Sequence, residues 1–216
     1  MTTSRTDRVL GFAHRGGMAD APENSLEAFS KALAAGATGL ESDVWLDADG
    51  EPVLHHGPPH RERDVPLSLA ELFRQCGTAF DLSLDLKGPG TAERTVSVAR
   101  EAGFDLTRLW LCGGSGSSAG WRVHDPRVRL VTDLRWREAL FHSEAAMQRI
   151  AADGIDAVNL RHGRWTRGLV RKAHAAGLLA FAWDVNSRVG LRLVVRRGVD
   201  GVYSDHVRLL VDALPR

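Results

Sequence analysis

The sequence predicts an α/β fold and, within that class, a (β/α)8 barrel formed by a single domain spanning residues 1–216. Three observations predict this fold. Short apolar runs alternate with longer amphipathic segments, as expected for β–α units with parallel strands. Glycine recurs where four of the amphipathic segments should end, at Gly36, Gly103, Gly177 and Gly198. About eight such units fit into 216 residues, which matches a compact barrel better than an open doubly wound sheet.

Strands are expected at the apolar runs, which number one more than a barrel needs. In chain order they are Val9–Ala13, Gly39–Trp45, Pro52–His55, Leu82–Leu86, Leu109–Cys112, Val128–Val131, Ala157–Leu160, Leu179–Trp183 and Gly201–Tyr203.

The extra run is Pro52–His55, because the segment LDADGE that precedes it is too short for a crossover helix. Asp49-Gly50 is a strong signal for a two-residue turn. We therefore expect a β-hairpin arm after the second strand. With Asp49 and Gly50 at the tip, counting outwards places His56 opposite Asp43.

Helices are expected between the strands, and their ends carry the usual signals. Asn24 precedes the first one, with Glu27 three residues later as a capping-box partner. The expected helices are Ser25–Ala35, Leu69–Gln75, Thr91–Ala102, Glu144–Ala152, Thr166–Ala176, Arg188–Arg197 and His206–Leu214.

Composition, net charge and the distribution of apolar residues indicate which partners and which compartment to expect. Hydrophobic residues make up 44% of the chain and the formal net charge is +1, so neither nucleic acid nor an anionic membrane is predicted as a partner. The N-terminal residues lack the apolar core and cleavage site of a signal peptide, and no apolar run approaches the length of a membrane span. We expect a cytoplasmic protein without a stable membrane anchor, and the oligomeric state stays open.

Ionisable residues gather at the expected carboxyl ends of the early strands, where active sites of this fold lie. Residues two apart on a strand share a face, which pairs Glu41 with Asp43 and Asp85 with Lys87. The full set expected to converge is His14, Arg15, Glu41, Asp43, His56, Asp85 and Lys87.

Each residue type in this set indicates a chemical role. Three converging carboxylates repel unless a cation neutralises them, and an all-oxygen set suits one divalent cation, Mg²⁺ or Ca²⁺. Histidines titrate near neutral pH and suit acid–base catalysis. Arginine and lysine suit an anionic oxygen. The combination predicts cleavage of a phosphate ester in a small molecule.

Seven segments in fixed order carry a family resemblance: HRG at His14–Gly16, PENS at Pro22–Ser25, ESDV at Glu41–Val44, DGEPVLHH at Asp49–His56, LDLK at Leu84–Lys87, AWDVN at Ala182–Asn186 and GVDGVYSD at Gly198–Asp205. The chain resembles the glycerophosphodiester phosphodiesterases, barrel enzymes related to phospholipase C-like phosphodiesterases. The resemblance implies hydrolysis of glycerophosphodiesters to glycerol 3-phosphate and an alcohol.

The resemblance also implies a role for each matched residue. Glu41, Asp43 and Asp85 would bind the divalent metal, and His14 and His56 would be the acid–base pair. The phosphate would lie against Arg15 and Lys87, and Trp183 would line the substrate pocket. The glycines after Arg15 would let the phosphate approach the backbone.

The chain departs from the family pattern in four ways, at three positions and in the length of one segment. Gly57 stands where the family has aspartate, Asp85 replaces a glutamate, and Asp184 adds a carboxylate near the mouth. The insertion that many members carry after the second histidine is truncated, since 30 residues separate His56 from Lys87.

Several alternatives stay open at this stage. A one-residue slip of the hairpin would exchange the roles of His55 and His56. Arg15 could instead pair with Glu23 in a structural turn. The activity could be that of a lysophospholipase D or sphingomyelinase D acting on lipids, or the chain could bind phosphodiesters without catalysis. Attack by water or by a neighbouring substrate hydroxyl, and which histidine is the acid, are equally open.

Overall fold

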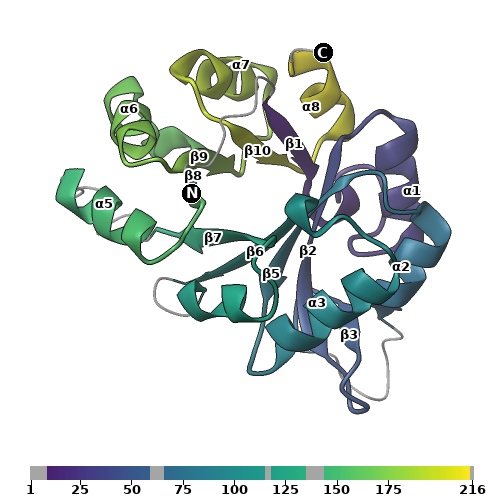
Figure 1. The fold of residues 1–216 in the computed structure, drawn as a ribbon. Coiled ribbons are helices and arrows are strands. Elements are labelled where there is room, and N and C mark those ends of the chain that lie inside the picture. The colour runs from purple at the N-terminus through teal and green to yellow at the C-terminus, as the bar shows by residue number, and fades with distance from the viewer. Residues whose placement is uncertain (1–8, 59–65, 115–117, 135–143, 215–216) are drawn as a thin grey trace.

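The computed structural model describes residues 9–58, 66–114, 118–134 and 144–214. Within these ranges a parallel sheet closes on itself, because β1 pairs with β2 on one side and with β10 on the other. This closure confirms the predicted (β/α)8 barrel (Figure 1). The barrel strands are β1 Leu10–Ala13, β2 Gly39–Leu46, β5 Asp81–Leu86, β6 Leu109–Gly114, β7 Arg129–Asp133, β8 Ala157–Arg161, β9 Leu179–Trp183 and β10 Gly201–Ser204.

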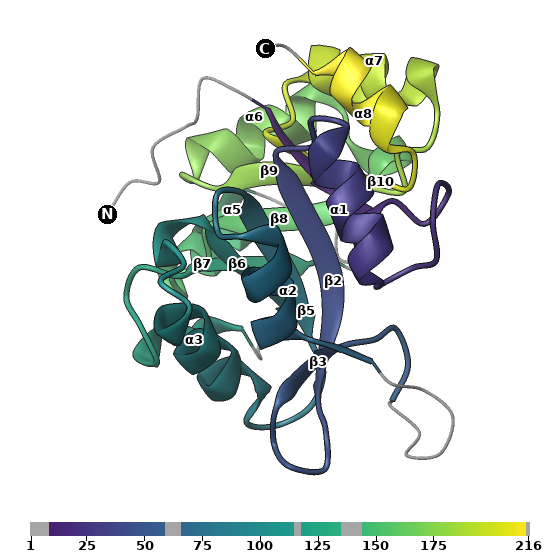
Figure 2. The same cartoon turned by 90° about the vertical axis from the view of Figure 1, so that its right-hand side faces the viewer.

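Helices surround the barrel, as Figures 1 and 2 show from two sides. All seven predicted helices are present, and their ends lie within two residues of the expected ones. They are α1 Leu26–Ala34, α2 Leu69–Cys76, α3 Thr91–Glu101, α5 Glu144–Ala152, α6 Arg167–Ala175, α7 Arg188–Arg197 and α8 Val207–Ala213. Short 3-10 turns add η1 His14–Gly16, η2 Leu106–Arg108, η3 Ala119–Val123 and η4 His162–Arg164.

Large aromatic side chains fill the inside of the barrel. The rings of Phe12 and Tyr203 stack with centroids 4.9 Å apart, and Trp110 lies 5.0 Å from Phe181. Gly201 makes room for this packing, because a Cβ there would lie 2.6 Å from the Phe181 ring. The interior is therefore a packed core, and any open cleft must lie at an end of the barrel.

The cap of the first helix differs from the prediction. Ser25, not Asn24, is the N-cap, and its Oγ accepts a hydrogen bond from the Ala28 N–H at 3.1 Å. Asn24 adopts a left-handed φ of 55° and is buried, where its Oδ1 accepts from the Ser42 hydroxyl at 2.7 Å. Asn24 thus ties the loop after β1 to strand β2, a long-range contact that local capping rules cannot reveal.

The hairpin arm is present, and its register differs by one residue from the expected one. The arm pairs β2 with β3 Pro52–Leu54, and β3 with a two-residue strand β4 Leu67–Ser68 that was not predicted. Val44 lies opposite Leu54, so the turn has three residues rather than two. Gly50 is left-handed in it, with φ of 81°. Part of the shortened segment after His56, residues 59–65, lies outside the described residues.

Candidate active site

A cleft of about 1040 Å³ opens at the carboxyl ends of the barrel strands. It is lined by every side chain that the sequence singled out, which confirms their convergence. These are His14, Arg15, Glu41, Asp43, His56, Asp85, Lys87 and Trp183.

The turn after β1 is conformationally unusual and brings two of these residues to the cleft. Arg15 has a left-handed φ of 49°, and Gly16 and Gly17 follow with φ of 82° and 88°. A Cβ on Gly16 would lie 2.7 Å from the Ala28 Cβ, and one on Gly17 would lie 2.3 Å from Val207. Packing against the neighbouring helices therefore accounts for glycine at both positions, and the phosphate approach expected there stays a prediction.

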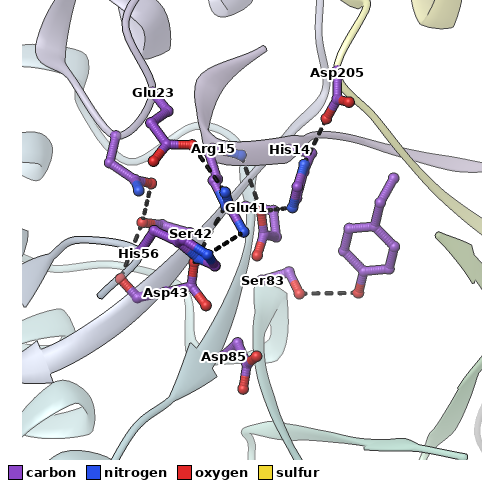
Figure 3. A network of polar contacts seen from close by, with 12 residues as sticks. His14, Arg15, Glu23, Glu41, Ser42, Asp43, His56, Ser83, Asp85 and Asp205 are labelled. Atoms are coloured by element: carbon purple, nitrogen blue, oxygen red, sulfur yellow. Dashed lines mark hydrogen bonds and ion pairs between the residues drawn. The ribbon is translucent and has the colours of Figure 1, made fainter. Parts of the chain in front are cut away.

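His14 is held by a carboxylate from the other end of the chain. Its Nδ1 lies 2.6 Å from Asp205 Oδ1, and its Nε2 lies 3.7 Å from Glu41 Oε2 (Figure 3). Asp205 is fixed in turn by Asn186, whose Nδ2 donates to Asp205 Oδ2 at 2.6 Å and whose Oδ1 accepts from the Asp205 N–H at 2.9 Å. Asp205 and Asn186 lie in segments that carry the family resemblance, yet no role was predicted for either.

His56, like His14, has a carboxylate next to its Nδ1 atom. Its Nδ1 lies 3.1 Å from Asp43 Oδ2, and its Nε2 lies 3.4 Å from Arg15 Nη2. The neighbouring His55 instead places Nδ1 2.7 Å from the Gly57 carbonyl. The register change did not exchange the two histidines, because both lie beyond the end of β3, where strand alternation no longer applies. Asp43 also supplies the carboxylate that Gly57 lacks.

Asp43 and Asp85 lie directly opposite each other on β2 and β5, and Lys87 bridges them. The Lys87 ammonium is 3.1 Å from Asp43 Oδ1 and 2.5 Å from Asp85 Oδ2. Arg15 approaches Asp43 from the other side, with its Nε 3.3 Å from Oδ2. Its Nη1 donates to Glu23 at 2.8 Å, so the Arg15–Glu23 pair considered from the sequence is present.

Glu41 and Asp43 are the two buried residues among the three predicted metal ligands. Glu41 is 8% exposed, and its Oε2 accepts the Arg15 backbone N–H at 3.0 Å. Burial raises the pKa of Glu41 to about 7; nearby His14 opposes this rise and Asp43 adds to it. Burial also raises the pKa of Asp85, although Lys87 counteracts it. Burial therefore disfavours the ionised form of Glu41 and Asp85, and a positive charge placed between them would favour it.

This donor set suits a hard divalent cation in its chemistry. Glu41 Oε1 and Asp85 Oδ1 accept no hydrogen bond from any described residue, and a cation there would favour their ionised forms. As the side chains stand, however, no three acidic, histidine or cysteine groups among the described residues form a ready metal site. Lys87 holds Asp43 and Asp85 together in the role of counterion.

The far rim of the cleft carries Trp183, which is 42% exposed. The Arg161 guanidinium lies 6.0 Å above its ring and donates from Nε to Asp184 Oδ2 at 2.8 Å. The extra carboxylate noted at Asp184 is thus paired, and its φ of 61° turns the chain at the end of β9. Trp183 lines the cleft as predicted.

The closed barrel and this cleft define a (β/α)8-barrel protein whose site is built from histidine–carboxylate pairs and a carboxylate cluster. Residues 14–85 and 96–209 match the glycerophosphoryl diester phosphodiesterase family, and the chain belongs to that family.

Two proteins that are similar in sequence are named glycerophosphodiester phosphodiesterases. Glycerophosphodiester phosphodiesterase of Caldanaerobacter subterraneus is 22% identical over 242 residues, which cover 95% of this chain and 97% of the relative. Glycerophosphodiester phosphodiesterase 1 of Rattus norvegicus is 56% identical over 50 residues, and the match spans 23% of this chain and 15% of that longer protein.

Solved structures share the fold. An Oleispira antarctica phosphodiesterase in complex with the product sn-glycerol-3-phosphate superposes with a TM-score of 0.78 at 20% identity, covering 94% of this chain and 96% of that one. A glycerophosphodiester phosphodiesterase from Agrobacterium tumefaciens gives 0.77 at 17% identity, covering 94% and 99%.

Proposed function

We propose that this chain is a metal-dependent glycerophosphodiester phosphodiesterase that releases glycerol 3-phosphate and an alcohol by acid–base catalysis from His14 and His56. One observation carries the proposal. Two histidines from different elements each have Nδ1 against a carboxylate, so each directs Nε2 toward the same cleft, beside Arg15 and Lys87.

The histidine partners define the protonation chemistry. A carboxylate that accepts from Nδ1–H holds the tautomer in which Nε2 has a free lone pair and can take a proton. The same carboxylate stabilises the imidazolium that forms. His14 paired with Asp205, and His56 paired with Asp43, can therefore each give or take one proton. One would activate the nucleophile and the other would protonate the leaving oxygen.

Arg15 and Lys87 are assigned to the phosphate, since both are cations that line the same cleft as the two histidines. Both are engaged with carboxylates in the structure, Arg15 with Glu23 and Lys87 with Asp85. These pairs keep the two cations in place, and a phosphate oxygen would compete with the carboxylates for their N–H donors.

Glu41, Asp43 and Asp85 are assigned to one divalent cation, Mg²⁺ or Ca²⁺. A cation bound there would neutralise charge that develops on the phosphate oxygens. Glu41 also supports the site directly, because its bond to the Arg15 N–H fixes the turn that carries His14. Trp183 is assigned to the wall of the substrate pocket.

The proposal also covers the domain organisation, the compartment and the partners of the protein. It is a single domain over residues 1–216 that acts in the cytoplasm on a small phosphodiester, without a nucleic-acid partner. Its near-neutral net charge supports this view. Within the described ranges, no helix combines the length and apolar character needed to cross a lipid bilayer.

A lysophospholipase D or sphingomyelinase D activity on lipids is the second candidate, and three exposed apolar side chains favour it. Met18 follows β1, Trp183 ends β9 and Val189 lies in the first turn of α7, all at the carboxyl edge of the barrel. They are 40%, 42% and 78% exposed. Exposed apolar side chains of this kind can contact an acyl chain.

The test is release of glycerol 3-phosphate from glycerophosphocholine and glycerophosphoethanolamine, with Mg²⁺, Ca²⁺ or EDTA. Metal-dependent turnover that is lost in His14→Ala and His56→Ala, and kept in His55→Ala, supports the proposal. His55 is the matched control, because it neighbours His56 without lining the cleft.

Other outcomes separate the alternatives. A cyclic phosphate product would identify attack by the substrate hydroxyl instead of water. Turnover of lysolipids alone would favour the second candidate. Metal binding by a folded protein with no turnover of either substrate class would leave a non-catalytic binder.

A further inference from the structure

The wall of the cleft that faces His14 carries a carboxylate that the proposed chemistry does not use. Asp133 ends β7, which lies four strands from β1 in either direction around the barrel. Asn159 lies directly beside it on β8, where the two residues are in register. Both side chains line the cleft.

These two side chains form a fixed pair with unused acceptors. Asn159 Nδ2 donates to Asp133 Oδ1 at 2.8 Å, and the Leu134 N–H donates to the Asn159 carbonyl at 3.0 Å. Asp133 Oδ2 accepts no hydrogen bond from any residue in the described ranges. Asn159 is only 8% exposed, and its buried Oδ1 likewise has no partner among them. Buried acceptors are normally satisfied, so Asn159 Oδ1 indicates a site for a donor beside the partly buried Asp133.

The charge around Asp133 indicates which donor fits. Burial raises the pKa of Asp133 to about 6, and the charge of Asp85 adds to this rise while Lys87 opposes it. No described arginine, lysine or histidine forms an ion pair with Asp133, in contrast to Asp184, which Arg161 neutralises. A cation supplied by a ligand would satisfy both the charge and the open acceptors.

We propose that Asp133, held by Asn159, binds a primary ammonium on the alcohol part of the substrate. A primary ammonium has three N–H donors, enough for Asp133 Oδ2 and Asn159 Oδ1 together. A quaternary ammonium has none, and it prefers aromatic faces. Among the described residues that line this cleft, Trp183 has the exposed ring, and the Arg161 guanidinium already lies over it. The cleft therefore favours ethanolamine-type over choline-type alcohols. This inference rests on the proposed function and specifies its substrate class.

The experiment compares kcat/KM for glycerophosphoethanolamine, glycerophosphocholine and glycerophosphoglycerol, whose alcohol is neutral, with the full chain in the metal that supports turnover. The wild type is expected to prefer the ethanolamine ester over the choline ester by about tenfold or more, the size of one charge-assisted hydrogen bond. Asp133→Asn should bring this ratio close to one. It should leave glycerophosphoglycerol turnover within about threefold, which also reports that the variant is folded.

Asp184→Asn is the matched control, because it removes one carboxylate from the same cleft whose oxygens already accept from Arg161 and Asn186. Its ethanolamine-to-choline ratio should stay at the wild-type value. Asn159→Leu should lower the ratio, since it releases Asp133 from its fixed orientation.

Two results would overturn the inference. If wild type and Asp133→Asn show the same ethanolamine-to-choline ratio of kcat/KM, Asp133 does not distinguish the two alcohols. If Asp133→Asn loses all three substrates equally, Asp133 binds their common glycerol part. Absence of turnover on every glycerophosphodiester would count against the proposed function itself. In that case calorimetric binding of phosphoethanolamine against phosphocholine still decides the point, because equal affinities for wild type would refute an ammonium site.

Discussion

The two histidines of the site are held by regions of very different character. His14 follows a central barrel strand, is 31% exposed, and its partner Asp205 is itself clamped by two hydrogen bonds to Asn186. His56 lies on the hairpin arm, is 57% exposed, and depends on Asp43 and the nearby Arg15. The closed barrel supplies the carboxylate partner of one histidine, whereas the other stands on a two-stranded arm and is more open to solvent. The pair thus combines an enclosed imidazole with an accessible one.

The largest expected effect comes from removing either imidazole. His14→Ala and His56→Ala should each lower kcat by about 10²- to 10⁴-fold, the usual range for one proton-transfer group. Because His56 is more exposed than His14, the two alanine variants should differ in their rescue by added imidazole. Added imidazole should restore part of the activity of His56→Ala, because that site is open, and little of the activity of His14→Ala. Equal rescue of both variants would show that exposure does not distinguish them.

The next largest effect concerns Asp205 and Asn186, which hold the His14 ring in place. Asp205→Asn should lower kcat by roughly 10- to 100-fold and leave KM nearly unchanged, because the amide no longer stabilises the imidazolium while substrate contacts stay intact. Asn186→Leu should show a smaller loss of the same kind, through Asp205. Steady-state kinetics measures both. A rise in KM without a change in kcat would mean that Asp205 serves binding and not positioning.

The carboxylate beside His14 should make stability depend on pH. The pKa of Glu41 rises from 4.5 to about 7 on folding, so the folded protein binds a proton more tightly than the unfolded chain. The free energy of unfolding therefore falls as pH rises through this window, and the loss is complete above pH 7. The shift corresponds to at most about 3 kcal/mol.

Denaturant unfolding in EDTA at pH 5 and pH 8 measures this effect. Glu41→Gln should remove most of the pH dependence, whereas the exposed Glu27→Gln should keep it. A wild-type protein that is more stable at pH 8 than at pH 5 would contradict the assignment of this dependence to Glu41.

The smallest effect should arise at the turn of the arm. Gly50→Ala places a Cβ in open space at a φ of 81°, so backbone strain alone should lower stability by about 1 kcal/mol. Activity should fall a few-fold through His56. Gly57→Ala is the matched control, since its Cβ also meets open space and no left-handed φ is required. Thermal unfolding and kcat together separate the two variants.

Much of the barrel follows from local pattern. Alternation of apolar runs and helices places every barrel strand, and spacing of two along a strand brings Glu41 with Asp43, and Asp85 with Lys87, into one cleft. These features depend on neighbours in the sequence, which is why they could be predicted.

What the sequence did not reveal depends on contacts across the barrel. Asn24 does not cap the first helix, because its side chain accepts a hydrogen bond from Ser42. The hairpin turn has three residues instead of the expected two, with Gly50 in a left-handed conformation. Asp205 could have been suspected as a carboxylate directly after the last strand. Its distance to His14, however, is set by the pairing of the first and last strands, which no local pattern encodes.

That pairing has a consequence for synthesis. β1 closes the ring by pairing with β10, and the aspartate that orients His14 follows β10 directly. A ribosome-bound chain that has not yet released residues 201–205 already holds Arg15, Glu41, Asp43, His56 and Lys87. It still lacks the Asp205 carboxylate that contacts Nδ1 of His14. Closure of the ring and placement of the carboxylate that orients His14 are then the same event, so the site of a nascent chain is complete only when β10 is in place.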